Sequence, residues 1–271
     1  MLSNTLQFKS RTTWPDNGLK NLSKESVNDR TMRAVILAAG CGERLLPLTK
    51  NYPKPLTPVI GKPLLEHIVE TLKEAMVKDI IIVTGYLNHF IQEYCGDGSK
   101  FHVKIRYAYN PVYKNGNGNS LKVARELLAE GEAFLLLMSD HLIDVDIVNK
   151  ALRNVDHKPL LCVDRQPHYP SQIKDATRVL VNPEGYIINI GKDIAHWNGV
   201  DTGVFILDNN IFEAMEEGEK MSHFATISDY IKRLITNGKP LWACDVSRLF
   251  WLDIDTVDDL ESAKLILREE R

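Results

Sequence analysis

Short apolar runs alternate with amphipathic stretches from Met32 onward. Residues 34–37 and 80–83 are continuous apolar runs with the length of buried strands. Between these runs, apolar side chains recur at the spacing of one helix face, at Leu64, Leu65, Ile68, Val69 and Leu72. A strand, a helix and a strand in this order predict a βαβ unit, in which the two strands are parallel.

The alternation continues to Met138 and then changes. Strands are predicted at residues 103–107 and 134–138, with a helix at 121–128 between them. The second half has shorter connections, such as the turn at 182–185, which favour antiparallel additions to the parallel sheet. Strands are predicted there at residues 160–163, 178–181, 186–190, 204–207 and 250–254, followed by a closing helix through Leu260, Ala263, Leu265 and Leu267.

This pattern predicts an α/β fold with a Rossmann-like, mixed but mainly parallel sheet flanked by helices. No repeat or Pro/Ser-rich linker divides residues 32–271, so we expect one domain there. Residues 1–31 are rich in Ser, Asn, Thr and Lys and are interpreted as a flexible N-terminal extension. Two alternatives stay open: a misassigned start, because Met32 directly precedes the first strand, and an arm that docks on a partner subunit in a homodimer.

The composition is that of a globular protein, with 44% hydrophobic and 25% charged residues. The net charge of -3, from 33 basic and 36 acidic residues, gives no electrostatic sign of nucleic-acid binding. The four cysteines lie far apart in the sequence, which argues against a disulfide framework and a zinc site. Because neither a membrane span nor a signal peptide is present in the sequence, we expect a cytoplasmic protein without direct membrane insertion.

Two glycines directly follow the first predicted strand. Gly40 and Gly42 would let backbone N–H groups approach phosphate oxygens, and Arg44 would add a fork of donors. A plain tight turn is the alternative; the third glycine of a dinucleotide fingerprint is missing, and the segment is not a Walker A loop. Lys54 lies between two prolines that fix its direction, so we expect it to reach back to the same phosphates.

Carboxylates occur at two other places in the predicted sheet. Asp140 follows the strand at 134–138, at the edge where α/β proteins bind ligands, with a helix N-cap as the alternative. Asp253 and Asp255 are two residues apart, so strand alternation would put both on one face. Capping of the closing helix is the alternative for Asp255. His141 and the four tryptophans are interpreted as packing or hydrogen-bonding residues.

The segment from Met32 to Glu66, with its Gly-x-Gly-x-Arg, Pro-Lys-Pro and Gly-Lys-Pro-Leu motifs, resembles the signature of the sugar-phosphate nucleotidyltransferase superfamily. The resemblance implies that Asp140 binds Mg²⁺ together with Asp253 or Asp255, since this hard cation prefers oxygen ligands. It also implies that nucleoside triphosphate is contacted by Leu37, Ala38, Ala39, Gly40, Gly42, Glu43, Arg44, Lys54, Gly85, Asn117, Gly118, Ser120 and Asp140.

Residues 115–120, 138–141, 163–165, 190–193 and 199–205 together resemble CTP:inositol-1-phosphate cytidylyltransferases, a likeness that covers about residues 32 to 270. It implies that Lys192 contacts the acceptor phosphate and that Asp201 and Thr202 face the polyol hydroxyls. Asn119 departs from the aromatic residue that this family often has. Many members continue into a membrane-embedded CDP-alcohol phosphotransferase, whereas this sequence ends at Arg271, so we expect a stand-alone cytidylyltransferase.

The expected reaction is a Mg²⁺-dependent transfer from CTP to inositol 1-phosphate, which gives CDP-inositol, for phospholipid biosynthesis, and pyrophosphate. In this hypothesis Arg44 stabilises the leaving pyrophosphate, while Lys54 and Lys192 bracket the reacting phosphates. A rival is transfer to a hexose 1-phosphate or phosphocholine, from CTP or another triphosphate. A second rival is a non-catalytic nucleotide-binding paralogue, against which the retained arginine, lysine and aspartates argue.

Overall fold

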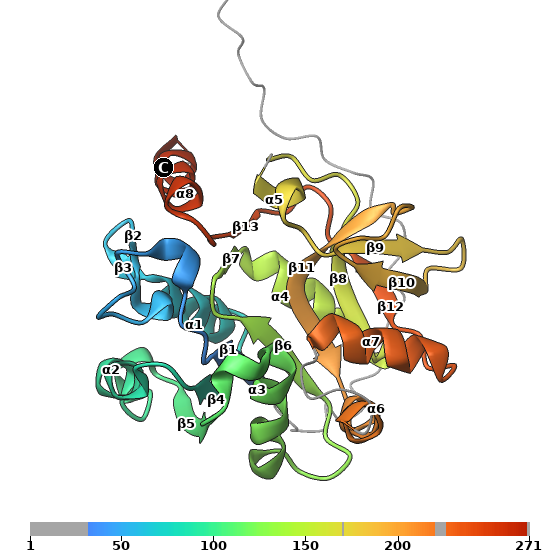
Figure 1. Cartoon of the computed structure of the whole chain (residues 1–271), viewed down its shortest axis with the longest axis horizontal. Coiled ribbons are helices and arrows are strands. Elements are labelled where there is room, and N and C mark those ends of the chain that lie inside the picture. The colour runs from blue at the N-terminus through green and yellow to red at the C-terminus, as the bar shows by residue number, and fades with distance from the viewer. Residues whose placement is uncertain (1–31, 170, 220–225, 270–271) are drawn as a thin grey trace, which may run out of the picture. The chain divides into compact units, whose positions relative to one another are not determined.

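A computed structural model describes residues 32–169, 171–219 and 226–269 of the chain (Figure 1). The predictions made for residues 1–31 lie outside these ranges. The described part contains a large mixed sheet with helices on both faces, so the predicted α/β fold class is confirmed. No helix in the described ranges has both the length and the apolar character needed to cross a membrane.

The sheet has nine strands within the described residues, and its main path runs β10-β9-β11-β6-β1-β4-β5. Strands β6, β1, β4 and β5 are parallel to one another. Strand β11 runs antiparallel to β6 and also pairs antiparallel with β8, and β8 pairs in parallel with β12. The strands are β1 (Arg33–Ala38), β4 (Asp79–Thr84), β5 (Lys104–Tyr109), β6 (Phe134–Met138), β8 (Leu160–Asp164), β9 (Arg178–Val181), β10 (Ile187–Gly191), β11 (Gly199–Leu207) and β12 (Trp242–Asp245).

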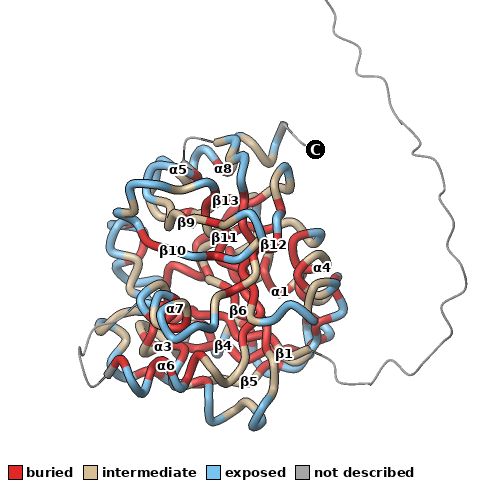
Figure 2. Tube along the Cα trace, turned by 90° about the vertical axis from the view of Figure 1, so that its right-hand side faces the viewer, coloured by how far each residue is buried: buried red, intermediate tan, exposed pale blue. Residues whose placement is uncertain are grey.

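Two apolar cores lie on opposite faces of this sheet. Along β1, Ala34 and Ile36 join the core on one face, while Val35 and Leu37 join the core on the other, as strand alternation requires. Figure 2 shows buried chain through the middle of the molecule and exposed chain on its outer turns. The first face is covered by α1 (Leu64–Glu74), α2 (Asn88–Cys95) and α4 (Val145–Arg153), and the second by α3 (Asn117–Ala124), α6 (Asn210–Glu219) and α7 (Ile227–Thr236).

The predicted βαβ unit is confirmed as β1, α1 and β4. The helix predicted at 121–128 begins earlier, at Asn117, and its α-helical part ends at Ala124. Residues 117–120, which were not included in the predicted helix, therefore belong to it. Strand β12 and helices α2, α4, α6 and α7 were not predicted. Strand β12 is only four residues long and has a mixed apolar pattern. Helices α4 and α7 are clearly amphipathic, with buried side chains at Ile147, Val148 and Ala151 and at Ile227, Tyr230, Ile231 and Leu234, so helical spacing could have revealed them.

The last predicted strand is present but does not join the main sheet. Residues Trp251–Asp253 form β13, which pairs antiparallel with β7 (His141–Ile143) in a separate two-stranded sheet. A second small sheet joins β2 (Pro58–Val59) to β3 (Lys62–Pro63), and α8 (Val257–Glu269) packs near it; α5 (Ser171–Lys174) is a single turn close to β13. The β7–β13 pairing brings the two predicted carboxylate motifs together across more than one hundred residues of sequence.

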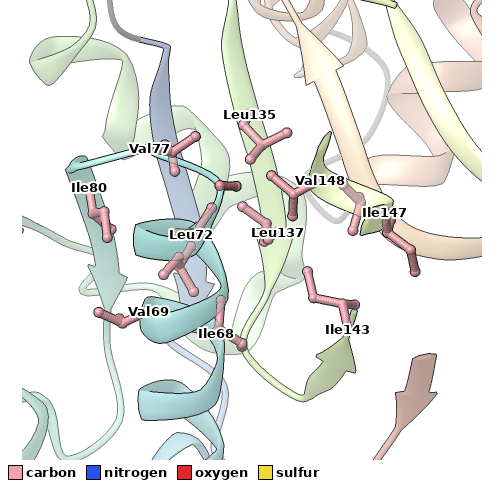
Figure 3. Packing of buried hydrophobic residues seen from close by; sticks show 14 of the residues in the cluster. Ile68, Val69, Leu72, Val77, Ile80, Leu135, Leu137, Ile143, Ile147 and Val148 are labelled. Carbon is pink, nitrogen blue, oxygen red and sulfur yellow. The ribbon is translucent and has the colours of Figure 1, made fainter. Parts of the chain in front are cut away.

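Leu72 is fully buried between α1 and the sheet, in the cluster that Figure 3 shows. We expect Leu72→Ala to lower the free energy of unfolding by about 2–5 kcal/mol, because the truncation removes apolar contacts and leaves a cavity. Urea denaturation followed by circular dichroism measures this change. Leu265→Ala, in α8, removes the same atoms from a residue that is 60% exposed and should cost less than about 1 kcal/mol. Equal losses in the two variants would contradict this account of the core.

Candidate active site

The loop after β1 packs directly on Lys54. Gly42 has a φ of 63°, and a Cβ atom there would come within 2.7 Å of the Lys54 Cβ. The Thr49 hydroxyl donates to the Gly42 carbonyl oxygen at 2.7 Å and holds the turn. Gly42 therefore serves both a left-handed backbone conformation and a close approach, so a glycine is required there by geometry.

Lys54 is a buried lysine held between two carboxylates. Its Nζ donates to Asp140 Oδ2 and to Asp255 Oδ1, each at 2.7 Å. Burial by itself lowers the pKa of Lys54, but the charges of Asp140 and Asp255 more than offset this effect, so the pKa lies above its ordinary value. Arg44 donates to the other oxygen of Asp255, and it makes a longer contact of 3.5 Å with Asp175.

Asp140, His141 and Asp253 form a cluster whose potential ligand atoms all lie within 4.8 Å of one another. His141 Nδ1 lies 2.9 Å from Asp140 Oδ1 and 3.9 Å from Asp253 Oδ1. Burial by itself lowers the pKa of His141, but the Asp253 and Asp140 carboxylates raise it to about 9. The register of β13 on β7 places Asp253 opposite His141, which explains why residues so far apart in sequence meet here.

Asp253 has a buried oxygen without a hydrogen bond. Its Oδ1 finds no hydrogen-bond partner among the described residues. Burial raises the pKa of Asp253 to about 7, against the opposing effect of His141 and with a further contribution from Asp140. An unsatisfied carboxylate oxygen beside a second carboxylate fits the oxygen ligation that Mg²⁺ requires.

Asp255 is engaged differently from Asp253. Both of its carboxylate oxygens accept from cations, namely Lys54 and Arg44. Burial raises its pKa, but Lys54 and Arg44 more than offset this, so the pKa lies below its ordinary value. The alternative interpretation of Asp255 as the helix cap is wrong: Thr256 and Asp259 exchange the capping hydrogen bonds of α8.

The helix-cap alternative for Asp140 is also wrong. Asp140 leads into β7, and the N-cap of α4 is Asp144, whose side chain accepts from the Asp146 N–H. Asp140 instead stands at the carboxyl end of β6, next to the end of β1, as the strand pattern predicts.

Two pockets adjoin at Asp140. The first, the loop pocket, has a volume of about 520 Å³ and lies beside the loop after β1. The second, the Asp201 pocket, has a volume of about 190 Å³, and both pockets share Arg44, Asp140 and Asp255. The loop pocket is lined by ten of the residues predicted to contact nucleotide, namely Leu37, Ala39, Gly40, Gly42, Glu43, Arg44, Lys54, Asn117, Ser120 and Asp140.

Three residues predicted to contact nucleotide lie behind this pocket. Ala38 is buried in the core under α1, and Gly118 is buried within α3. Gly85 follows β4 beside Ala39, whose carbonyl oxygen accepts from the Tyr86 N–H. These residues support the wall of the pocket, because successive strand residues point to opposite faces and successive helix residues are turned by about 100° from one another.

The Asp201 pocket holds two of the three residues predicted to bind the acceptor. Lys192 and Asp201 line it, whereas Thr202 is fully buried and its hydroxyl donates to the Cys162 carbonyl oxygen at 3.0 Å. The structure therefore places the Thr202 side chain away from this pocket, since successive residues of β11 point to opposite faces. Burial raises the pKa of Asp201 to about 6, although the Gly203 N–H that donates to it acts in the other direction.

Gly203 fixes the position of His141 at the boundary of this pocket. Its φ is 77°, and a Cβ atom there would lie 2.8 Å from the His141 Cδ2. The His141 ring also stacks on Trp251 at a centroid distance of 6.2 Å. The Trp251 Nε1 donates to the buried Asp164 at 2.9 Å, so the aromatic ring is anchored in turn.

Sequence reasoning missed several residues of the pockets. Asp175 and Gln172 line the Asp201 pocket from the segment around α5, and Ser228 does so from α7. No motif or period marks these positions, because their approach depends on long-range packing. His141 and Trp251 also line this pocket; they were interpreted only as packing or hydrogen-bonding residues, although their neighbours Asp140 and Asp253 pointed to the site.

Known proteins resemble this chain in sequence and in fold. The family model described as nucleotidyl transferase matches residues 33–168. The chain is 37% identical over 239 residues to a bifunctional IPC transferase and DIPP synthase of Aquifex aeolicus, which covers 86% of this chain and 51% of that protein. It is 31% identical over 245 residues to the N-acetylmuramate alpha-1-phosphate uridylyltransferase of Neisseria meningitidis serogroup B. This match covers 87% of this chain and 98% of that protein.

A solved structure named as the inositol-1-phosphate CTP transferase from T. maritima superposes with a TM-score of 0.76 at 23% identity, over 89% of this chain and 97% of that one. This likeness shows a shared fold. The chain spans about half the length of the bifunctional relatives that it matches. The match of the family model and the nearly complete coverage of the uridylyltransferase lead to one conclusion. The chain belongs to the nucleotidyl transferase family.

Proposed function

We propose that the chain transfers a cytidylyl group from CTP to inositol 1-phosphate and releases pyrophosphate. The observation that carries this proposal is the meeting of the loop pocket and the Asp201 pocket at Asp140. A triphosphate in the first pocket and a phosphorylated acceptor in the second would place their reacting groups at one point. Holding two reactants in this way supplies much of the rate enhancement of a transfer reaction.

In the proposed reaction, a phosphate oxygen of the acceptor attacks the α-phosphorus of CTP. The bond from that phosphorus to the bridging oxygen breaks, and pyrophosphate leaves with the bonding electrons. The acceptor is a phosphate monoester that is largely a dianion at neutral pH, so no side chain has to remove a proton. Lys54 and Arg44 would neutralise charge on the triphosphate, and Lys192 would bind the acceptor phosphate.

Asp140 and Asp253 are the residues that would hold a Mg²⁺ ion in this proposal. The buried oxygen of Asp253 without a hydrogen bond, beside Asp140, supports this choice over Asp255. The ion would supply positive charge to the phosphates and to the leaving group. Asp255 is the weaker candidate, because both of its oxygens already accept from cations.

The choice of CTP and inositol 1-phosphate is supported by the names of the relatives. Bifunctional IPC transferases are 32–37% identical to this chain, and a structural neighbour is named an inositol-1-phosphate CTP transferase. The Asp201 pocket offers carboxylates, an amide and a lysine, groups that can bind a polyol through its hydroxyls and its phosphate. Homodimer formation and cytoplasmic location stay predictions from the sequence.

A grid of substrates tests the reaction. Pyrophosphate release would be measured with four nucleoside triphosphates against inositol 1-phosphate, a hexose 1-phosphate and phosphocholine, with and without a metal chelator. We expect release with CTP and inositol 1-phosphate and its loss with the chelator. Release with uridine triphosphate and a sugar phosphate alone would favour the activity named for the uridylyltransferase relative and would reject our choice of substrates.

Lys54→Ala should lower kcat/KM for CTP by about 10²-fold or more, because it removes a preorganised positive charge from the phosphates. Steady-state kinetics measures the loss, and circular dichroism checks that the variant is folded. Lys50→Ala removes an exposed lysine close by in the sequence that does not line either pocket, so its activity should stay close to that of the wild type. Near-normal turnover by Lys54→Ala would show that the role given to Lys54 is wrong.

Asp201→Asn should stabilise the fold at pH 8 while weakening binding of the acceptor. The raised pKa of about 6 means that ionisation of Asp201 costs folding free energy; the fold is most stable while Asp201 is protonated, and this stability is lost as the pH rises through 6. Asparagine avoids that cost, so we expect a gain of about 1–3 kcal/mol at pH 8.

Denaturation curves at pH 4.5 and pH 8, with the KM for inositol 1-phosphate, measure both effects. The difference in stability should be clearly smaller at pH 4.5 than at pH 8, because Asp201 is then mostly protonated in the folded state, whereas the unfolded chain is already partly ionised at this position. A variant that is less stable at pH 8 would contradict the view that ionisation of Asp201 destabilises the fold.

A further inference from the structure

Both cations that the proposed function gives to the triphosphate are already bound by one carboxylate. Asp255 Oδ1 accepts from Lys54 Nζ at 2.7 Å, and Asp255 Oδ2 accepts from Arg44 Nη2. The Asp255 carboxylate places one anionic oxygen on the lysine and the other on the arginine. A phosphate group would bind the same donors in this way. While Asp255 keeps its position, it occupies one N–H of Lys54 and the Nη2 of Arg44, and its negative charge repels a triphosphate that approaches the remaining donors of the two cations.

The hydrogen bonds of Asp255 to Lys54 and Arg44 are strong enough to compete with a bound phosphate. The side chains of Lys54 and Asp255 are only 10% and 13% exposed, so water screens their pair weakly. Arg44 is more exposed, at 51%, but it contacts the same carboxylate. Hydrogen bonds between charged, partly buried groups are worth more than those at the surface.

The Asp255 carboxylate does not cap the helix that follows it. This carboxylate accepts only from Lys54 and Arg44 among the described residues, and the cap of α8 is made by Thr256 and Asp259 instead. Asp253 differs, because one of its oxygens has no such partner. The two aspartates of the late motif therefore face different partners: Asp253 faces the ligand cluster, and Asp255 faces the phosphate-binding cations.

We propose that Asp255 is an internal competitor of the triphosphate. It holds Arg44 and Lys54 between turnovers, yields them to the nucleotide, and takes them back as pyrophosphate leaves. This inference rests on the proposed function, since it needs Arg44 and Lys54 to bind the triphosphate. Asp255 is thus a positioning residue: it sets how tightly the site holds pyrophosphate, and with it the rate of product release.

Replacement of Asp255 should tighten the binding of phosphates. Asp255→Asn removes the competing charge and leaves a neutral side chain of the same size, while Lys54 keeps its bond to Asp140. We expect inorganic pyrophosphate and CTP each to bind about 10-fold more tightly, the worth of one charged hydrogen bond. Damage to the fold would weaken binding, so a gain in affinity separates this role from a merely structural one.

Asp175→Asn is the matched control. It removes the same charge from the same arginine, but Asp175 contacts Arg44 at 3.5 Å and is 53% exposed. Its effect on pyrophosphate affinity should be less than about twofold, as for an exposed ion pair. A gain in Asp175→Asn equal to that in Asp255→Asn would overturn the proposal, because loss of any negative charge would then suffice.

The experiment is titration calorimetry of the full chain with inorganic pyrophosphate and with CTP, in Mg²⁺ and in chelator, for the wild type and both variants. Turnover assays should show a lower KM for CTP and stronger inhibition by pyrophosphate in Asp255→Asn. If Asp255→Asn does not fold, Asp255→Ser, which also removes the charge, is measured in its place. Unchanged or weaker pyrophosphate binding in the folded variant would overturn the proposal.

The outcomes also separate this inference from the function on which it rests. If the wild type binds neither CTP nor pyrophosphate, the proposed function fails, and the inference fails with it. If the wild type binds both ligands and Lys54→Ala weakens their binding, but Asp255→Asn does not tighten it, only the inference fails. Tighter binding in Asp255→Asn with little change in Asp175→Asn supports both.

Discussion

The Lys54 ammonium joins parts of the chain that are more than two hundred residues apart. It donates to Asp140 at the end of β6 and to Asp255 before α8, while its own backbone lies under the loop after β1. A lysine this buried would lose its charge without partners, and the two carboxylates keep it charged. The placement of the loop, the strand end and the closing segment therefore depends on this set of contacts. Both pockets adjoin it.

The buried carboxylates of the site lower the stability of the folded protein. Asp201 and Asp253 are buried carboxylates whose raised pKa values report unfavourable ionisation, and one oxygen of Asp253 has no hydrogen bond among the described residues. Such groups are expected where a protein binds charged or polar ligands, because those ligands supply the missing partners. The large apolar cores on both sheet faces offset the cost and leave the scaffold rigid enough to hold Asp140, His141 and Asp253 together.

Much of the scaffold follows from periodicity alone. The apolar runs that became β1, β4 and β6 are long, uninterrupted and buried on both faces, so their signal is clear. Strand β12 is four residues long and mixes Trp242 with Ala243 and Asp245, so it gives no such signal. The pairing of β13 with β7 is also invisible in the sequence, because it is set by packing between distant segments.

The sequence by itself determined the fold class, the loop with Arg44 and Lys54, and the importance of Asp140 and the late aspartates. These features depend on neighbouring residues: a strand end, a glycine turn and alternation within a few positions. Only the tertiary structure decided that Asp253 joins the Asp140 cluster, that Asp255 pairs with the cations, and that Thr202 points away from the pocket. The physical reason is that local periodicity fixes which residues share a face, whereas long-range packing fixes what that face meets.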